Sequence, residues 1–377
     1  MNETWWVNAG QLDHDQKSVL RTDPSASLLI KGPPGSGKTN ILLLRANYVK
    51  ATHPRILFLT FTRTLTEFIR SGPSIGRPDQ IQRNEIMTFM RWGTTFLNER
   101  GNPFVSPGGN FKTIRKALFT QVSEYVKTNK LGKFYDTVFL DEVQDFRDEE
   151  INVLSDLSET LNAAGDSRQS IWGHKQGLPK MEGVADEVVE LEKHYRIGIK
   201  ICHFADRILP PQVGESSLAE NCYYDEASRP SSITPISSGS SEEQYRLCLD
   251  RLKRQIRYIN DEPILVMAHT QATRDAFWNA LEVDGDLVGK SIIQSSEGYE
   301  PFGPDSLIRV MTIASAKGSE ARAVHILKAD RLDATLRELA FTGVTRAKTE
   351  VALYHTGPLP GHLQPPSEEL PEIDDIF

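Results

Sequence analysis

The sequence predicts an α/β protein with two successive, mostly parallel sheets. Short β-branched or aliphatic runs alternate with longer amphipathic stretches, and this alternation occurs in two sets along the chain. Such alternation is typical of strands joined by helical crossovers, which produce parallel sheets. A segment rich in Pro, Ser and Glu, residues 209–242, separates the two sets. The length of 377 residues suits two medium domains better than one.

The expected elements follow from these runs. In the first set, strands are expected at Leu28–Ile30, Ile56–Thr60, Thr137–Leu140 and Leu161–Ala164. In the second set, they are expected at Ile264–Ala268, Leu307–Ile313, Ala323–Leu327 and Val351–Tyr354. Helices are expected after Lys38, after Thr62, across Gln271–Leu281 and across Ala334–Ala347. One short strand is expected near Ile233–Ile236. The expected domains are 1–190, 191–358 and a disordered acidic, Pro-rich tail over 359–377.

Composition indicates an ordinary soluble globular protein, with 39% hydrophobic and 25% charged residues. No apolar run approaches eighteen residues, and MNETWWVNAG lacks a basic-then-apolar signal pattern. We therefore expect a cytoplasmic protein that does not bind membranes. The three cysteines, Cys202, Cys222 and Cys248, form no CxxC pair. Their spacing fits a reducing cytosol and argues against a zinc site or an iron–sulfur cluster.

Charge is unevenly distributed around a net value of −8. Residues 60–135 hold twelve Lys/Arg against five Asp/Glu, a local +7, whereas residues 201–377 hold seventeen against twenty-seven, a local −10. This asymmetry allows a basic groove for nucleic acid on an acidic protein. On charge alone, a merely solvated basic face is an equal alternative.

A phosphate-binding loop is predicted by KGPPGSGKTN, which has the G-x-x-x-x-G-K-[ST] spacing directly after an apolar run. Glycines let the backbone N–H groups point at phosphate oxygens, and the following helix N-terminus adds a favourable dipole. Lys38 would bridge the β- and γ-phosphates, and the Thr39 hydroxyl would ligate Mg²⁺. The expected nucleotide-binding residues of this loop are Gly32, Gly35, Ser36, Gly37, Lys38 and Thr39.

An acidic cluster follows another apolar run in VFLDEVQDF. A solvated acidic turn would look similar, but the phosphate loop about a hundred residues upstream supplies a partner. Asp141 is expected to hold Mg²⁺ from the end of a neighbouring strand, directly or through water. Glu142 is the natural base for the attacking water. The pair therefore indicates ATP hydrolysis, with ATP and Mg²⁺ bound.

The sequence resembles the UvrD/Rep-like superfamily 1 helicases, in blocks that occur in the right order over about residues 12–348. The blocks are LDHDQ, the phosphate loop, LTFTRTL, MTFMRW, DEVQD, LNAAGDSRQSIW, LEKHYR, TIASAKGSE and AFTGVTRA. The resemblance implies two tandem RecA-like P-loop NTPase domains with the ATP site in the cleft between them.

The resemblance also implies roles around the nucleotide. Gln16 would read the adenine edge and Tyr195 would stack on adenine. Gln169 would contact the γ-phosphate, which two arginine fingers, Arg196 and Arg346, would also reach. Gly318 and Glu320 would lie beside the ribose and phosphates.

A second set of residues would lie near single-stranded DNA by the same resemblance: Thr60, Phe61, Thr62, Arg63, Thr88, Phe89, Trp172, His174 and Thr312. His174 takes the position of the family's stacking tryptophan, a departure that could weaken the grip on DNA. Asn40 replaces an arginine that packs on adenine, and Ala314 replaces a histidine.

The chain is also shorter than well-known members of that family, which carry large inserted subdomains. About fifty residues separate Phe89 from Asp141, and twenty-five lie between Leu281 and Leu307. We expect a compact two-domain motor whose first insert is a small helical remnant near Ile114–Lys127.

The leading functional hypothesis is a DNA-stimulated ATPase that translocates 3′ to 5′ on single-stranded DNA, with unwinding as a further ability. The alternative is a nucleotide-gated regulatory subunit that controls a partner nuclease or effector in a repair or antiphage defence complex. Single-stranded RNA stays open as a substrate, because no motif reads the 2′-hydroxyl. The end of the chain, PEIDDIF, resembles the acidic tip of bacterial single-stranded-DNA-binding proteins and could bind a partner. A solubilising tail or a plug over the basic region are the alternatives.

Overall fold

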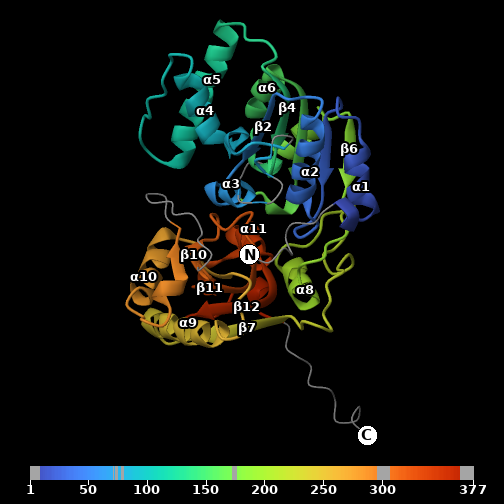
Figure 1. Cartoon of the computed structure of the whole chain (residues 1–377). Coiled ribbons are helices and arrows are strands. Elements are labelled where there is room, and N and C mark those ends of the chain that lie inside the picture. The colour runs from blue at the N-terminus through green and yellow to red at the C-terminus, as the bar shows by residue number, and fades with distance from the viewer. Residues whose placement is uncertain are drawn as a thin grey trace.

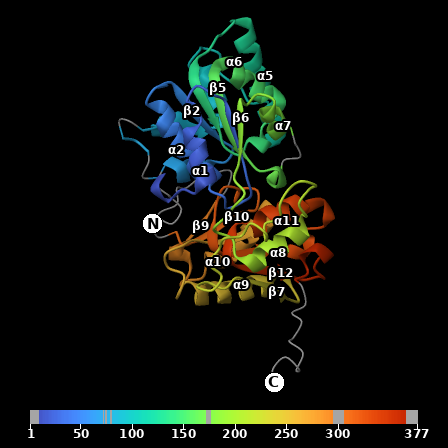
Figure 2. The same ribbon diagram turned by 90° about the vertical axis from the view of Figure 1, so that its right-hand side faces the viewer.

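The computed structural model describes residues 9–70, 72, 75–77, 80–171, 176–294 and 306–365. Its strands form two sheets. Figure 1 shows one sheet above the other, the upper drawn in blue to green and the lower in yellow to red. Figure 2, turned by 90°, shows the same two layers. The α/β fold class with two tandem, RecA-like parallel sheets is therefore confirmed.

The first sheet has the strand order β3-β2-β4-β5-β1-β6, and its neighbouring strands pair in parallel. Its strands are β1 (Leu28–Lys31), β2 (Ile56–Thr60), β3 (Ile86–Thr88), β4 (Tyr135–Leu140), β5 (Ser158–Gly165) and β6 (Glu187–Glu190). Its helices are α1 (His14–Arg21), α2 (Lys38–Lys50), α3 (Arg63–Arg70), α4 (Phe89–Asn98), α5 (Phe111–Thr128), α6 (Asp148–Leu157) and α7 (Gly177–Glu182).

Helices cover both faces of this sheet, which explains why its strands are apolar without alternation. Leu28 and Ile30 pack into the core with α2, whereas Leu29 between them packs into the core with α4, α5 and α6. All three side chains are fully buried.

The second sheet has the order β7-β12-β11-β8-β10-β9, again with parallel pairings. Its strands are β7 (Ser232–Ser237), β8 (Ile264–Ala268), β9 (Ser291–Ile293), β10 (Ile308–Thr312), β11 (Ala321–Leu327) and β12 (Ala347–His355). Its helices are α8 (Ile199–Ile208), α9 (Ser241–Gln255), α10 (Gln271–Leu281) and α11 (Arg337–Val344). One core joins this sheet to α8 and α11, and another joins it to α9 and α10.

The expected strands are all present, with ends that differ by up to four residues. Three short strands, β3, β6 and β9, were not predicted. Each has only three or four residues, and β6 is mostly exposed, so the apolar signal of a buried strand is missing. The helix expected over Ala334–Ala347 is a 3-10 turn, η7 (Ala334–Leu336), followed by α11.

The expected disordered tail needs a correction at its start. Residues 359–365 include η8 (Gly361–Leu363), and Leu359 and Leu363 are buried in the core that contains α8. Burial of these two leucines holds the segment on the second sheet. The suggested partner-binding end, PEIDDIF, lies outside the described residues.

Only α4 and α5 stand between β3 and β4, a stretch that the structure describes throughout. The first insert is therefore the small helical unit that the sequence predicted, with α5 somewhat longer. No helix within the described ranges is both long and apolar enough to cross a membrane.

Candidate active site

A cavity of about 610 Å³ lies between the two sheets. This volume is within the range of small-molecule and cofactor sites. Most of the predicted nucleotide residues line it: Gln16, Gly35, Ser36, Gly37, Lys38, Thr39, Glu142, Gln169, Tyr195, Arg196, Gly318, Glu320 and Arg346. Gly32 and Asp141 do not line it, although both contact residues that do. Residues far apart in sequence thus converge on one pocket.

The loop between β1 and α2 has the backbone that a phosphate cradle needs. Gly35 and Gly37 have φ values of 83° and 85°, in the left-handed region that favours glycine. Gly37 caps α2, so the helix N-terminus opens into the cavity. Lys38 Nζ donates to the carbonyl oxygens of Gly32 (2.7 Å) and Pro33 (2.8 Å). The lysine is therefore held against the loop whose phosphate it is predicted to bind.

The Thr39 hydroxyl and the Asp141 carboxylate lie next to each other beside this loop. The Thr39 side chain hydrogen-bonds Asp141, and Asp141 Oδ1 accepts from Glu142 N at 3.0 Å. Asp141 Oδ2 is buried and has no hydrogen-bond partner within the described ranges. Burial and the Glu142 charge raise the pKa of Asp141 to about 7. A hydroxyl beside an unsatisfied carboxylate oxygen is a donor set that fits Mg²⁺.

Glu142 follows at the end of β4 with a φ of 56°, which turns the chain sharply toward the cavity. Burial would raise the pKa of Glu142, but Lys317, Lys38 and Arg346 outweigh it and lower that pKa. Gln144 Nε2 donates to Glu142 Oε2 at 2.6 Å. The carboxylate is therefore kept ionised and oriented, as a proton acceptor requires.

A chain of hydrogen bonds runs from Glu142 to the second sheet. Gln144 Oε1 accepts from Asp166 N at 3.1 Å, and Asp166 Oδ2 accepts from Gln169 Nε2 at 2.9 Å. Gln169 Oε1 in turn accepts from Arg346 Nη2 at 2.8 Å. The carboxylate at the end of β4 is thus connected to the arginine just before β12.

Lys317 makes a second link between the halves. Its Nζ donates to Asp145 Oδ2 at 2.6 Å and to the Gln169 carbonyl at 2.7 Å, and lies 3.4 Å from Glu142 Oε2. Burial would lower the pKa of Lys317, but Asp145 and Glu142 raise it, so the ammonium stays charged. This residue was not predicted from the sequence, although it stands next to Gly318 in the same block. The buried acids of DEVQD need a cation as a partner, and this need is the signal that could have pointed to Lys317.

Tyr195, Arg196 and Gln16 also line the cavity. Arg196 forms an ion pair with Glu320, and the Tyr195 hydroxyl donates to Asp13 Oδ2 at 2.6 Å. Gln16 Nε2 donates to the Ser36 carbonyl at 3.0 Å, and its Oε1 accepts from Asp13 N at 3.2 Å. To pair with adenine, Gln16 would have to release these contacts.

The residues expected near nucleic acid are mostly packed within the first half. Thr60 is fully buried, and its hydroxyl lies 2.5 Å from that of Thr66. Phe89 is 3% exposed and packs on Phe146. Phe61 packs edge-on against Phe146 as well. Thr60 and Phe89 are therefore buried within the first half, whereas Phe61 is partly exposed.

The remaining expected contacts occupy turns. Thr62 and Thr88 cap α3 and α4, where their hydroxyls accept from Leu65 N and Arg91 N at 3.2 Å. The Thr312 and Ser315 hydroxyls lie 2.9 Å apart. Arg63 is exposed. Trp172 and His174 lie outside the described residues.

Comparisons with known proteins match the blocks described above. Residues 16–175 match the family described as AAA domain, and residues 307–354 match the UvrD-like helicase C-terminal domain. Over 90 residues the chain is 31% identical to one subunit of an ATP-dependent helicase/nuclease of Oenococcus oeni (strain ATCC BAA-331 / PSU-1). That match covers 21% of this chain and 8% of the relative, so the chain corresponds to a small part of it.

Two solved structures are similar at low identity. The C-terminal domain of a possible DNA helicase from Lactobacillus plantarum WCFS1 has 20% identity and a TM-score of 0.34, covering 45% of this chain and 92% of that one. The PRRSV helicase has 16% identity and a TM-score of 0.43, covering 90% of this chain and 54% of that one.

The two family matches fall on the two sheets and include the phosphate loop, the acidic pair and the loops of the second sheet that reach them. This agrees with the order of blocks along the chain. Together, these matches support the assignment of the chain as a UvrD-like superfamily 1 helicase.

Proposed function

We propose that this protein hydrolyses ATP to translocate 3′ to 5′ along single-stranded DNA and to unwind duplexes. The observation that carries the proposal is the division of the cavity between the halves. The first half contributes the phosphate loop and Glu142 to the cavity, and the second half contributes Arg346. Lys317 of the second half binds the acids beside the cavity. Hydrolysis would then require both halves to close on one nucleotide.

The chemistry follows from the charges around the cavity. Lys38 and the backbone N–H groups of the loop would hold the β- and γ-phosphates. Thr39 and Asp141 would hold Mg²⁺, which would neutralise phosphate charge as it develops. Glu142 would accept the proton of the attacking water, and Gln169 would position that water or the γ-phosphate. Arg346, one contact from Gln169, would stabilise the charge of the transition state.

Movement of one half relative to the other would come from competition between the nucleotide and protein side chains for the same cationic groups. In this structure, Lys317 binds the acids of the first half, and Arg346 binds Gln169. The γ-phosphate of ATP would draw Arg346 and Arg196 toward itself, and its release would restore the first set of contacts. Such a two-state exchange of contacts makes nucleotide state control the gap between the halves.

The DNA strand would lie over the basic first half. Exposed basic residues there include Arg63 on α3, Arg91 on α4, and Lys112 and Lys116 on α5. The Thr62 hydroxyl donates to the carbonyl oxygen of Lys317 at 3.4 Å, so the start of α3 touches the loop of the second half that carries Lys317 and Gly318. The proposed direction rests on the family resemblance.

Steady-state ATP hydrolysis, measured with and without single-stranded DNA, single-stranded RNA and duplex, tests this function. Glu142→Gln is the control for contaminating hydrolase. We expect strong stimulation by single-stranded DNA that is absent in the variant. Hydrolysis that is indifferent to every nucleic acid would reject a translocase formed by this chain alone.

A second candidate function is a nucleotide-gated subunit for a nuclease or other effector. The small insert, α4 and α5 alone between β3 and β4, favours it, because little of this half is left to separate strands unaided. Partner-free unwinding of a duplex with a 3′ single-stranded overhang distinguishes the two. Processive unwinding would argue against the regulatory role, whereas ATP hydrolysis without unwinding would favour it.

A further inference from the structure

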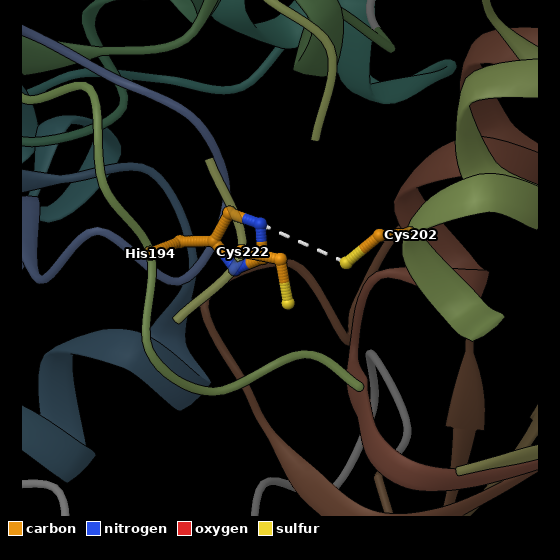
Figure 3. A group of neighbouring side chains, drawn as sticks. All are labelled: His194, Cys202 and Cys222. Carbon is orange, nitrogen blue, oxygen red and sulfur yellow. Dashed lines mark hydrogen bonds between the residues drawn. The ribbon is translucent and has the colours of Figure 1, made fainter. Parts of the chain in front are cut away.

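Three metal-ligating side chains meet beside the segment that crosses between the sheets. His194 lies just before Tyr195 and Arg196, Cys202 lies on α8, and Cys222 lies in the loop before β7. Figure 3 shows the Cys202 sulfur pointing toward the imidazole of His194, with Cys222 beside them. Two of these segments are tied together, because His194 and Cys222 form a parallel β-bridge.

The spacing of the three side chains suits a single small ion. One ligand atom from each residue lies within 4.8 Å of the others. Cys202 Sγ is 3.7 Å from His194 Nε2, so this sulfur is in contact with the imidazole ring. The Ile197 carbonyl oxygen is 3.4 Å from Cys202 Sγ and 3.3 Å from Cys222 Sγ, so a fourth position is offered an oxygen.

The imidazole has bonding capacity that its surroundings do not use. His194 is fully buried, and its Nε2 is 2.7 Å from the Leu218 carbonyl oxygen. Its Nδ1 is also buried and has no hydrogen-bond partner in the described part of the chain. Buried polar atoms are rarely left unpaired, and a bound metal ion would give this imidazole the partner it lacks. A contact to a backbone carbonyl is also the common way in which a metal-bound histidine is oriented.

A second cysteine–histidine pair in the same half shows what an ordinary buried pair looks like. Cys248 Sγ is 3.7 Å from His325 Nδ1, the same separation as in the first pair. Both nitrogens of His325 are satisfied, by the Tyr354 hydroxyl at 2.9 Å and by Gln255 Oε1 at 2.7 Å. Among the described residues, neither a second thiol nor an unpaired nitrogen accompanies that pair.

We propose that His194, Cys202 and Cys222 bind one zinc ion. Two thiolates and an imidazole are a donor set that zinc prefers, and binding would release the two thiol protons to solvent. Cys222 is only partly buried, which leaves a route for the ion. The cysteine spacing argued against such a site, but the fold brings together residues that the sequence keeps apart.

Zinc at this position would stiffen the segment that carries Tyr195 and Arg196 into the nucleotide cavity. The bridge to Cys222 and the helix of Cys202 would then act as one unit with the second sheet, because α8 packs in its core. The site is therefore structural and lies outside the cavity, and its occupancy does not depend on the proposed function.

Metal analysis of the full chain tests the proposal. The chain is purified in a non-chelating reductant with its affinity tag removed, and bound metals are quantified by plasma mass spectrometry. We expect about one zinc per chain in the wild type and in Cys248→Ser, and at least a tenfold loss in Cys202→Ser and Cys222→Ser. Equal zinc contents in all four proteins, or none in the wild type, would overturn the proposal.

Cobalt substitution keeps the test valid if the serine variants fail to fold. Wild-type chain is stripped with a chelator and titrated with Co²⁺. We expect thiolate-to-cobalt charge-transfer absorption that saturates at about one equivalent and is displaced by zinc. Absence of these cobalt bands from the fully reduced chain would contradict the site.

Discussion

The two halves of the molecule have similar sheets but present opposite ends of their strands to the nucleotide cavity. In the first half, the phosphate loop and the acidic pair follow the carboxyl ends of β1 and β4. In the second half, Glu320 and Arg346 come directly before β11 and β12, at the amino ends of those strands. Both sheets have six strands with parallel pairings and helices on both faces.

This difference shows that the sheet alone does not decide the chemistry. The first half supplies the glycine-rich loop, the Thr39 hydroxyl and the carboxylates of Asp141 and Glu142. Such a set can hold phosphate and a divalent cation. The second half supplies cations that reach the same point. Neither half has a complete site, so the proposed hydrolysis would depend on how the halves meet.

The largest expected effect comes from removing the cation that the second half contributes. Arg346→Gln should lower kcat by about 10³-fold or more, because an arginine finger stabilises charge in the transition state. Its contacts with Gln169 would be lost while the phosphate loop stays intact. Single-turnover hydrolysis with single-stranded DNA measures this effect. Arg331→Gln, an exposed arginine of the same half, is the matched control and should leave kcat unchanged.

A substitution of Lys317 tests the contact between the two halves of the molecule. Lys317→Met would leave Asp145 and Glu142 buried without their partner, which typically costs about 3–5 kcal/mol. Chemical denaturation should show this loss in the free energy of unfolding, and Lys290→Met on the exposed surface should not.

A double variant sharpens the Lys317 result. Adding Asp145→Asn to Lys317→Met removes the uncompensated charge and should recover part of the lost stability. Losses that simply add would mean that the two residues act independently, contrary to the 2.6 Å contact between them.

The segment after β12 gives a smaller effect that is confined to the second half. Leu363→Ala should lower the free energy of unfolding by about 2–5 kcal/mol, because Leu363 is fully buried in the core with α8. Hydrogen exchange should locate the change in α8 and β12. Protection unchanged there would mean that residues 359–365 do not pack against the second sheet.

The smallest effect is a pH dependence that comes from a buried histidine of the second half. Burial lowers the pKa of His325 to about 3, whereas an unfolded histidine titrates near 6.5. The unfolded chain therefore binds an extra proton below pH 6.5, and stability should fall from there toward pH 3, by about 2 kcal/mol at pH 5. The described part of the first half has no buried histidine. His325→Gln should flatten this part of the stability profile, whereas His53→Gln should not.

Local spacing explains what the sequence could predict. The phosphate loop and the pair Asp141–Glu142 were recognisable because consecutive residues dictate their geometry and each follows an apolar strand. Most of the predicted nucleotide residues do line one cavity. The short strands at the sheet edges were not predicted, because a strand such as β6 is mostly exposed and carries little apolar signal.

The site residues that could not be predicted from the sequence depend on contacts between distant segments. Lys317 meets Asp145 across 172 positions, and no local pattern marks such a pair. His194, Cys202 and Cys222 have no metal-ligand spacing and meet only because a loop returns to pair beside His194. Likewise, Thr60 and Phe89 belong to blocks associated with DNA, yet the fold buries both.

The central claim is that the nucleotide state controls how the two halves meet and hence how they hold single-stranded DNA. The most direct measurement is the affinity of Glu142→Gln for fluorescent single-stranded DNA, by anisotropy, without nucleotide, with ATP and with ADP. The account predicts affinities that differ by about 5–150-fold between the ATP and ADP states, with the reciprocal effect of DNA on ATP binding. The same affinity in all three states would contradict it.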